Sequence, residues 1–190
     1  MRIISGTSKG RRLIPVQGRG IRPTSDRVKE SIFNILGGDL EGKLVLDLFA
    51  GTGNLGIEAL SRGARKVFFV ERGRQALGLI KKNLSQCRME NRSEVLPKDS
   101  MRAVGILNQK GEVFDLIFMD PPYEKGWVKR MLAKLQERRI YHEGSLLVVE
   151  HDRREPLPKR TEGWNLIRQR QIGDTLISFL KATNGMTESV

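Results

Sequence analysis

The stretch Val45-Leu-Asp-Leu-Phe-Ala-Gly-Thr-Gly-Asn-Leu-Gly56 joins an apolar run to a helical pattern through a glycine-rich turn. Residues 44–49 are apolar except for Asp47, which is typical of a strand buried in a parallel sheet. Gly51 and Gly53 can adopt positive φ angles, and a helix that follows them offers free N–H groups at its N-terminus. The stretch therefore predicts an α/β domain with a nucleotide-type cofactor at its first strand-to-helix turn.

Apolar runs alternate with helical patterns along the rest of the chain. We expect helices over residues 24–36, 54–62, 74–88, 101–109 and 127–139, and strands over 44–49, 66–71, 94–96, 114–119 and 144–150. Strands that are apolar along their length and alternate with helices predict a parallel sheet covered on both faces, as in a doubly wound domain. Strand-like runs over 164–172 and 175–181 flank Gly173-Asp174, a signal for a terminal antiparallel hairpin.

The chain is basic, with a formal net charge of +12 over 190 residues, and this suggests a polyanionic partner. Residues 1–29 contribute +7 of that charge, because they hold one acid, Asp26, and eight basic residues: Arg2, Lys9, Arg11, Arg12, Arg19, Arg22, Arg27 and Lys29. Strand-like runs over 2–5 and 11–16 argue against one amphipathic targeting helix. We interpret the segment as a binding arm, with a solvated basic surface as the alternative.

Other features point to a soluble cytoplasmic protein. The sequence lacks an apolar run of about 18 residues that could span a bilayer. Cys87 is the single cysteine, which excludes an internal disulfide, and its helical pattern favours a packing role. We expect surface or strand-end roles for His142 and His151, and packing roles for Trp127 and Trp164.

The acids near the glycine turn distinguish the possible cofactors. Glu71, 18 residues after Gly53, is spaced to accept hydrogen bonds from ribose hydroxyls. Asp47 would be unfavourable beside a pyrophosphate but suits the cationic methionyl end of S-adenosylmethionine. The turn therefore favours S-adenosylmethionine over a dinucleotide, with a nicotinamide-dependent dehydrogenase and a ligand-free turn as alternatives. Asp99-Ser100 could meet the adenine edge, although Asp99 could equally cap the helix expected from about residue 101.

A second motif, Asp120-Pro121-Pro122-Tyr123, follows the strand expected over 114–119. Consecutive prolines remove two backbone donors and leave carbonyl oxygens free to accept hydrogen bonds. Asp120 and a proline carbonyl could accept both hydrogens of an exocyclic amine while Tyr123 stacks on the base. This would localise the nitrogen lone pair for in-line methyl transfer, without a metal ion. The alternative is a proline turn followed by an exposed tyrosine.

The two motifs together, residues 47–53 and 120–123, resemble class I S-adenosylmethionine-dependent methyltransferases that act on exocyclic amines. More narrowly, residues 22–36, 56–64 and 173–175 resemble the bacterial 16S rRNA guanine-N2 methyltransferases, a family named for guanine 966. The resemblance covers the chain from Arg2 to about Lys181. It implies a Rossmann-like, mostly parallel seven-stranded sheet over residues 22–183, a small β-hairpin extension over 1–21 and a frayed tail over 184–190.

Candidate residues fall into three groups when the resemblance is combined with the motifs. The cofactor group is Asp47, Phe49, Ala50, Gly51, Thr52, Gly53, Glu71, Asp99 and Ser100, and Gly56 is expected to pack instead. The target-base group is Asp120, Pro121, Pro122 and Tyr123. The RNA group is Arg2, Lys9, Arg11, Arg12, Arg19, Arg22, Thr24 and Arg27, although a capping role for residues 24–27 is an equal alternative.

The resemblance implies methylation of 16S rRNA with release of S-adenosylhomocysteine. We expect a monomer that acts on this RNA within an assembling or assembled 30S subunit. A DNA amino-methyltransferase shares both motifs, and a non-catalytic nucleic-acid binding module is a further alternative.

Overall fold

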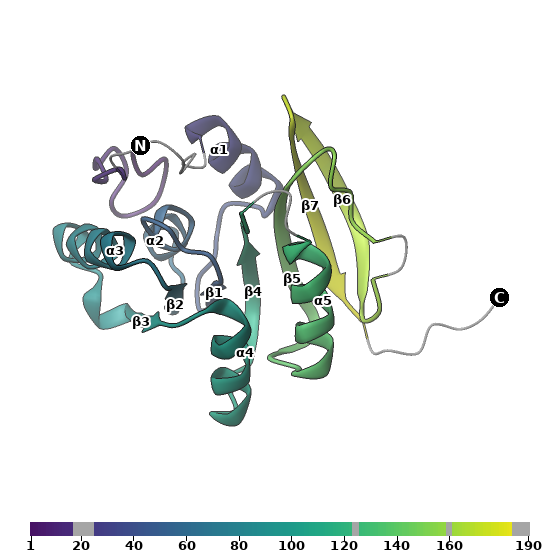
Figure 1. Cartoon of the computed structure of the whole chain (residues 1–190). Coiled ribbons are helices and arrows are strands. Elements are labelled where there is room, and N and C mark those ends of the chain that lie inside the picture. Colours follow the sequence, from purple (N-terminus) through teal and green to yellow (C-terminus); the bar gives the residue numbers. More distant parts are fainter. Residues whose placement is uncertain (17–24, 123–125, 159–160, 184–190) are drawn as a thin grey trace. The chain divides into compact units, whose positions relative to one another are not determined.

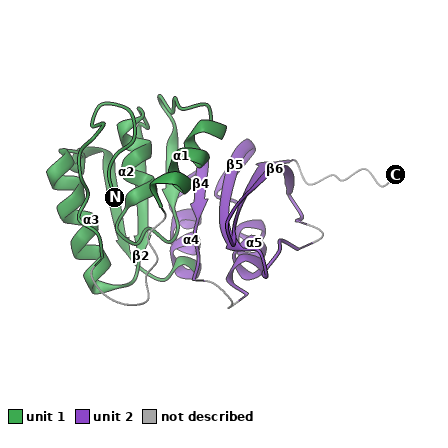
Figure 2. Cartoon of the chain, turned by 90° about the horizontal axis from the view of Figure 1, so that it is seen from above, with its two compact units in different colours: residues 1–100 green, residues 101–190 purple. Residues whose placement is uncertain are grey.

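The computed structural model describes residues 1–16, 25–122, 126–158 and 161–183. Arg19, Arg22, Thr24 and Tyr123 of the candidate groups lie outside the described residues, as does the tail over 184–190. Figure 1 shows the helices and strands along the chain. They form two compact units, Met1–Ser100 and Met101–Val190 (Figure 2). Among the helices of the described residues, none is long and apolar enough to cross a membrane.

The elements follow the expected alternation in both units (Figure 1). The first unit contains α1 (Asp26–Ile35), β1 (Leu44–Asp47), α2 (Asn54–Ser61), β2 (Lys66–Glu71), α3 (Arg74–Cys87), the 3₁₀ turn η1 (Glu90–Arg92) and β3 (Ser93–Pro97). Helix α4 (Ser100–Gln109) begins at Ser100, which is the last residue of the first unit. The second unit continues with β4 (Phe114–Met119), α5 (Trp127–Glu137), β5 (Tyr141–Asp152), β6 (Trp164–Ile172) and β7 (Thr175–Ala182).

The strands follow the order β3-β2-β1 in the first unit and β4-β5-β7-β6 in the second. In the first unit β1 pairs with β2, and β2 with β3, in parallel. In the second unit β4 and β5 are parallel, whereas β7 runs antiparallel to both β5 and β6. The expected Rossmann-like sheet, mostly parallel with a terminal antiparallel hairpin, is confirmed.

Two of the strand boundaries that differ from expectation have clear physical reasons. Strand β1 ends at Asp47, because the chain already turns at Leu48 toward the glycines. Strand β5 begins at Tyr141, three residues early, since Tyr141 pairs with Phe114 of β4. The positions where these strands begin and end therefore depend on the tertiary structure, which the periodicity of the local sequence does not report.

The N-terminal segment, residues 1–16, forms less β-structure than expected. Its two predicted strands are reduced to one antiparallel bridge between Arg2 and Arg12, supported by the Ile3 N–H, which donates to the Arg11 carbonyl at 2.9 Å. The strands fail to extend because helix α2 takes the backbone donors of Ile4 and Ser5. Both donate to the Glu58 carboxylate, at 2.8 and 3.0 Å.

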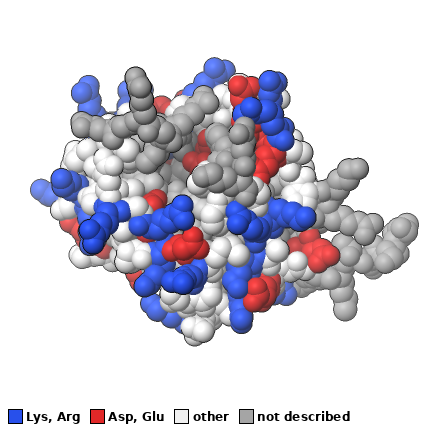
Figure 3. Space-filling view, in the orientation of Figure 1, with Lys and Arg blue, Asp and Glu red and all other residues white. Residues whose placement is uncertain are grey.

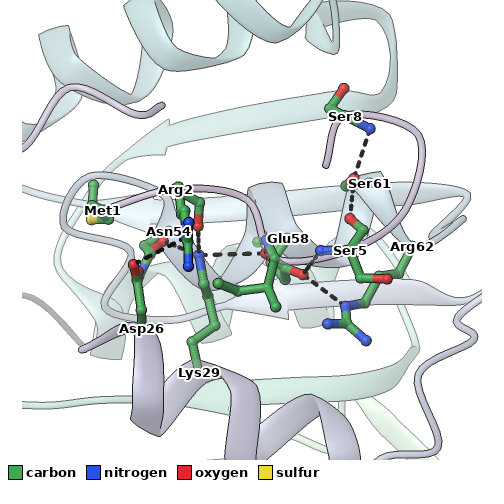
Figure 4. Close-up of polar contacts among 12 residues, drawn as sticks. Met1, Arg2, Ser5, Ser8, Asp26, Lys29, Asn54, Glu58, Ser61 and Arg62 are labelled. Atoms are coloured by element: carbon green, nitrogen blue, oxygen red, sulfur yellow. Dashed lines mark hydrogen bonds and ion pairs between the residues drawn. The ribbon is translucent and has the colours of Figure 1, made fainter. Parts of the chain in front are cut away.

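A buried ion cluster fastens this segment to helices α1 and α2 (Figure 4). Lys29 Nζ lies 3.4 Å from Glu58 Oε2 and donates to Asn54 Oδ1 at 2.8 Å and to the Arg2 carbonyl. On the other side of the carboxylate, Arg62 Nε donates to Glu58 Oε1 at 2.8 Å. The Lys29 and Glu58 side chains are fully buried. Lys29, counted above with the basic charge of residues 1–29, is therefore part of the core.

Burial lowers the pKa of Lys29, and the neighbouring Glu58 carboxylate opposes that shift. The cluster thus depends on the negative charge of Glu58, because desolvation of the ammonium has to be offset locally.

Glu58→Gln is expected to lower the free energy of unfolding by about 3 to 5 kcal/mol, because it leaves a buried lysine without its counter-charge. Urea denaturation monitored by circular dichroism would measure the loss. Glu94→Gln is the matched control. Its pair with Lys66, at 2.8 Å, is partly exposed, so the same substitution should cost less than about 1 kcal/mol. Equal losses would contradict the assignment of Glu58 as a buried anchor.

Helix α2 approaches strand β2 closely at Gly56, as expected for a packing glycine. A Cβ atom at this position would lie 2.3 Å from Cε1 of Phe69 and 2.9 Å from Cγ1 of Val67. Both side chains are fully buried and have little room to move. The glycine therefore sets the distance between α2 and β2.

Gly56→Ala should destabilise the fold by about 1 to 3 kcal/mol, because the added methyl group overpacks the interface. Gly78→Ala, on the exposed side of α3 with nothing within 4 Å of the new Cβ, should instead stabilise it by about 0.5 to 1 kcal/mol. Thermal unfolding of both variants checks the pair. A Gly56→Ala protein as stable as Gly78→Ala would show that α2 can shift freely.

Candidate functional site

Three candidate acids share one edge of the first unit. Parallel register places Asp47 of β1 beside Phe69 of β2, and Glu71 of β2 beside Pro97 of β3. Asp99 follows β3 by two residues. Because the carboxyl ends of neighbouring parallel strands meet at the same edge, the fold gathers Asp47, Glu71 and Asp99 where α/β domains bind ligands.

Hydrogen bonds hold the glycine loop, residues 51–53, from several directions. Gly51 and Gly53 have φ angles of 55° and 80°, which favour glycine. The Gly51 N–H donates to Glu71 Oε2 at 3.0 Å, and the Gly53 N–H donates to the Ala50 carbonyl at 2.7 Å. The Thr52 carbonyl accepts from Asn83 Nδ2 at 3.1 Å. The loop is thus preorganised ahead of any ligand.

The Glu71 carboxylate accepts hydrogen bonds from the glycine loop and from the two residues that follow β2. Besides the Gly51 bond, its Oε1 accepts from the backbone N–H groups of Arg72 and Gly73, at 2.8 and 2.7 Å. A carboxylate held by three backbone donors is fixed in orientation. Its expected contact with ribose hydroxyls stays a prediction, and would use the remaining acceptor capacity of the two oxygens.

Asp47 is a buried carboxylate with a perturbed pKa. Its side chain is nearly inaccessible, and its Oδ2 accepts from the Gly56 N–H at 3.1 Å. Burial raises the pKa of Asp47 to about 7; the Gly56 hydrogen bond opposes this shift and the Glu71 charge adds to it. A positively charged group beside Asp47 would lower this pKa and be held in return. The residues present therefore fit a cationic cofactor better than a pyrophosphate.

The remaining candidate cofactor residues line the same edge. Phe49 is half-buried and Ala50 is buried, with the Ala50 N–H donating to the Val70 carbonyl at 3.0 Å. Ser100 Oγ donates to the Leu48 carbonyl at 2.7 Å, so the hydroxyl ties the start of α4 to the end of β1. Asp99 lies 3.8 Å from the guanidinium of Arg72. That position, just before α4, suits both the expected adenine contact and the alternative capping role.

The proline motif directly follows β4 in the second unit. Parallel pairing of Met119 with Val149 of β5 places Asp120 just past the carboxyl end of β4. Asp120 is half-buried, Pro121 is buried and Pro122 is exposed, while Tyr123 lies outside the described residues. The motif thus occupies the strand end at which it was expected.

Five of the candidate RNA-binding residues are described, and all five are exposed: Arg2, Lys9, Arg11, Arg12 and Arg27. Arg2 lies 3.9 Å from Asp26, and the Arg11 guanidinium donates to the Gln86 carbonyl. Such exposed contacts are weak and can be exchanged for phosphate. On the face shown in Figure 3, basic side chains are interspersed with acidic ones.

The other residues singled out in the sequence have structural roles. Trp164 is buried against Tyr141, with ring centroids 4.3 Å apart, and Cys87 is buried in α3. His142 and His151 lie near the two ends of β5. His142 is exposed, whereas His151 is buried and bonds to Ser178 Oγ at 2.9 Å. The packing and strand-end predictions are confirmed for these four residues. Trp127, at the start of α5, is half-buried beneath the Arg130 guanidinium, 4.2 Å from its ring centroid.

Sequence reasoning missed Asn83. This fully buried amide contacts the glycine loop from helix α3. A signal was available, because Asn83 interrupts the apolar stripe formed by Ala76, Ile80, Leu84 and Cys87. A polar residue within such a stripe needs internal hydrogen-bond partners.

Asp47→Asn is expected to flatten part of the pH dependence of stability. The pKa of Asp47 is about 7 in the folded protein against an ordinary value of 3.8, so between these values the folded state binds more protons than the unfolded one. The contribution of Asp47 to the stability of the native sequence should therefore fall as pH rises from about 4 to about 7. The free energy of unfolding of the asparagine variant should rise relative to that of the native protein by up to about 1.4 kcal/mol per pH unit over this range. Urea unfolding across this range tests the prediction, and parallel curves would contradict it.

Comparison with known proteins assigns the chain to a family. Residues 1–181 match the family described as conserved hypothetical protein 95. A Bacillus subtilis protein named putative rRNA methyltransferase YlbH is 40% identical over 181 residues, covering 95% of this chain and 98% of the relative. The Escherichia coli ribosomal RNA small subunit methyltransferase D is 34% identical over 173 residues, covering 91% and 85%.

A solved structure agrees with these sequence matches. The structure described as putative methyltransferase yhhF from Escherichia coli superposes with a TM-score of 0.84 at 31% identity, covering 96% of this chain and 97% of the other. The match spans both motifs and the N-terminal segment. The chain therefore belongs to the conserved hypothetical protein 95 family of class I S-adenosylmethionine-dependent methyltransferases, and it has relatives named as ribosomal RNA small subunit methyltransferase D.

Proposed function

We propose that this protein methylates 16S ribosomal RNA of the small subunit, at the exocyclic N2 amine of the guanine that its family numbers 966. The observation that carries the proposal is the buried Asp47 carboxylate beside a preorganised glycine loop, in a chain whose relatives are named as small-subunit ribosomal RNA methyltransferases. We expect it to act as a cytoplasmic monomer on the 30S subunit.

The first unit holds the methyl donor in this proposal. S-adenosylmethionine supplies a methyl group activated by the positive charge of its sulfonium. Asp47 holds the cationic methionyl end, and residues 49–53 present backbone to it at close range. Glu71 and Asp99 accept hydrogen bonds from the ribose and the adenine amine. Support comes from the raised pKa of Asp47, since a carboxylate desolvated in this way favours a cation as its neighbour.

The motif of residues 120–123 receives the target base. Asp120 and a carbonyl oxygen of Pro121 or Pro122 accept the two hydrogens of the guanine amine, while Tyr123 stacks on the ring. Hydrogen bonds directed out of the ring plane would localise the nitrogen lone pair toward the methyl group that the donor supplies. Formation of the N–C bond would break the C–S bond and release S-adenosylhomocysteine, after which the nitrogen would give up one proton to solvent. Asp120 stabilises the positive charge that develops on nitrogen. The strand-end position of Asp120 supports this role.

Basic residues of the N-terminal region grip RNA phosphates. The proposal assigns this role to Arg2, Lys9, Arg11, Arg12, Arg19, Arg22, Thr24 and Arg27. Exposure of the five described arginines and lysines supports it. Their contribution should be largely independent of RNA sequence and sensitive to salt, whereas selection of one guanine requires an unpaired or flipped base.

Asp120→Asn should reduce methyl transfer by about 10²- to 10³-fold and leave S-adenosylhomocysteine affinity nearly unchanged, because the lost charge acts on the target nitrogen. Transfer of tritiated methyl groups to 30S subunits and calorimetric binding measure the two effects. Asp115→Asn, which changes a carboxylate of the same strand that pairs with His142, is the matched control and should retain activity. Equal loss of cofactor binding and transfer would remove Asp120 from the base site.

The substrate itself is tested by offering 30S subunits, naked 16S rRNA and duplex DNA in parallel. Label in RNA, recovered as N2-methylguanosine after digestion, supports the proposal. Label in DNA alone would identify a DNA amino-methyltransferase instead. A protein that binds RNA but transfers no label to any substrate would be a non-catalytic module. Calorimetric binding of NAD, without binding of S-adenosylmethionine, would favour the dehydrogenase alternative.

A further inference from the structure

Asn83 of helix α3 bonds at once to the N-terminal segment and to the glycine loop. Its Oδ1 accepts from the Ile14 N–H at 2.8 Å, and its Nδ2 donates to the Ile14 carbonyl at 3.2 Å. The same Nδ2 donates to the Thr52 carbonyl at 3.1 Å. One side chain therefore joins segments that lie 69 and 31 residues away from it along the chain.

The surroundings of Asn83 make these bonds costly to lose. Its side chain is fully buried between Ile80 and Leu84 on the core-facing stripe of α3, where water does not compete for the amide. The bond to Thr52 is buried and the two bonds to Ile14 are partly buried, so breaking them leaves the buried amide of Asn83 without partners, at a cost in free energy. A displacement of Ile14 therefore disturbs the hydrogen bond to Thr52, because the carbonyls of Ile14 and Thr52 accept from the same Asn83 side-chain amide.

A second contact joins the same two segments. Thr52 Oγ1 lies 3.6 Å from Met1 Sδ, and the Thr52 side chain is buried. Elsewhere the N-terminal segment is fixed by Glu58 and by Ser61, whose hydroxyl donates to the Ser5 carbonyl at 2.6 Å and accepts from the Ser8 N–H at 3.0 Å (Figure 4). These contacts hold the first half of the segment to α2. Asn83 and Met1 are what bring it to the glycine loop.

We infer that Asn83 is a positioning residue that couples RNA binding by the N-terminal segment to methyl-donor binding by the glycine loop. The inference rests on the proposed function, which places RNA phosphates at Arg11 and Arg12 and the donor at residues 51–53. RNA that orders the segment around Ile14 also restricts, through Asn83, the freedom that the Thr52 peptide still has within the hydrogen-bonded loop, so less of that freedom is left for the donor to remove. Linkage requires the reverse effect as well: bound donor strengthens RNA binding by the same factor.

Gln86, one turn further along α3, provides a matched control. The Gln86 side-chain Nε2 donates to the Arg12 carbonyl at 3.1 Å, and the Gln86 backbone carbonyl accepts from the Arg11 guanidinium. Gln86 thus contacts the same segment from the same helix through exposed hydrogen bonds, and both of these bonds are to the segment. Gln86→Ala removes the side-chain bond to the Arg12 carbonyl and keeps the backbone acceptor of Arg11, while the path from Ile14 to Thr52 stays intact.

The coupling is measured by equilibrium dialysis of tritiated S-adenosylhomocysteine against the full chain, with and without saturating 16S rRNA transcript. For the native sequence and for Gln86→Ala, RNA should tighten binding by about fivefold or more. For Asn83→Leu, which keeps the branched shape of the side chain and removes all three bonds, the ratio of the two dissociation constants should fall to about one. The ratio, rather than either affinity, separates coupling from a purely structural role.

Two results would overturn the inference: an Asn83→Leu ratio equal to that of the native sequence, or a native protein that methylates 16S rRNA and shows no effect of RNA on S-adenosylhomocysteine binding. In either case the proposed function stands. A native protein that transfers no methyl group to RNA refutes the proposed function instead.

If Asn83→Leu does not fold, amide hydrogen exchange of the native protein decides. S-adenosylhomocysteine should slow exchange of the Ile14 N–H, which bonds to Asn83, and leave the Ile4 N–H, which bonds to Glu58, unchanged. Unchanged exchange at Ile14 would overturn the inference.

Discussion

The turn between β1 and α2 has to hold Gly51 and Gly53 at positive φ, and hydrogen bonds from three sources keep it there. Glu71 of β2 accepts a hydrogen bond from the Gly51 N–H, and the Ala50 carbonyl accepts one from the Gly53 N–H. The Asn83 side chain of α3 donates to the Thr52 carbonyl. A backbone fixed in this way loses little freedom when it receives a ligand. The parallel register of β1, β2 and β3 then determines which acids stand around the turn.

Two buried carboxylates of the first unit illustrate different uses of burial. Glu58 lies between Lys29 and Arg62 and also accepts two backbone N–H groups, so its charge is matched inside the protein. Asp47 accepts a backbone N–H from Gly56, and its pKa rises to about 7. The first arrangement anchors helices and the N-terminal segment. The second holds a carboxylate whose ionised form would be stabilised by an added cation, as perturbed groups at functional sites often are.

Most of the fold could be predicted because its signals are local. Apolar runs such as residues 66–71 and 114–119 match β2 and β4 at both ends, and Gly173-Asp174 marked the turn between β6 and β7. Predictions were less accurate where a distant partner decides. The expected N-terminal hairpin is one bridge in the structure, because the backbone N–H groups of Ile4 and Ser5 donate to Glu58 instead. Strand β5 is longer than expected because Tyr141 pairs with Phe114 of β4.

The sequence by itself determined the order of helices and strands, the glycine turn with Asp47 before it, and the Asp120-Pro121-Pro122 corner, because each depends on residues adjacent in the chain. Tertiary structure decided which polar residues would meet. Lys29 was counted as surface charge and is buried against Glu58, while Asn83 lay unnoticed in a helical stripe and joins Ile14 to Thr52. Such pairings arise from how helices pack and have no spacing rule along the chain, since a buried polar group takes whichever partner the fold brings near.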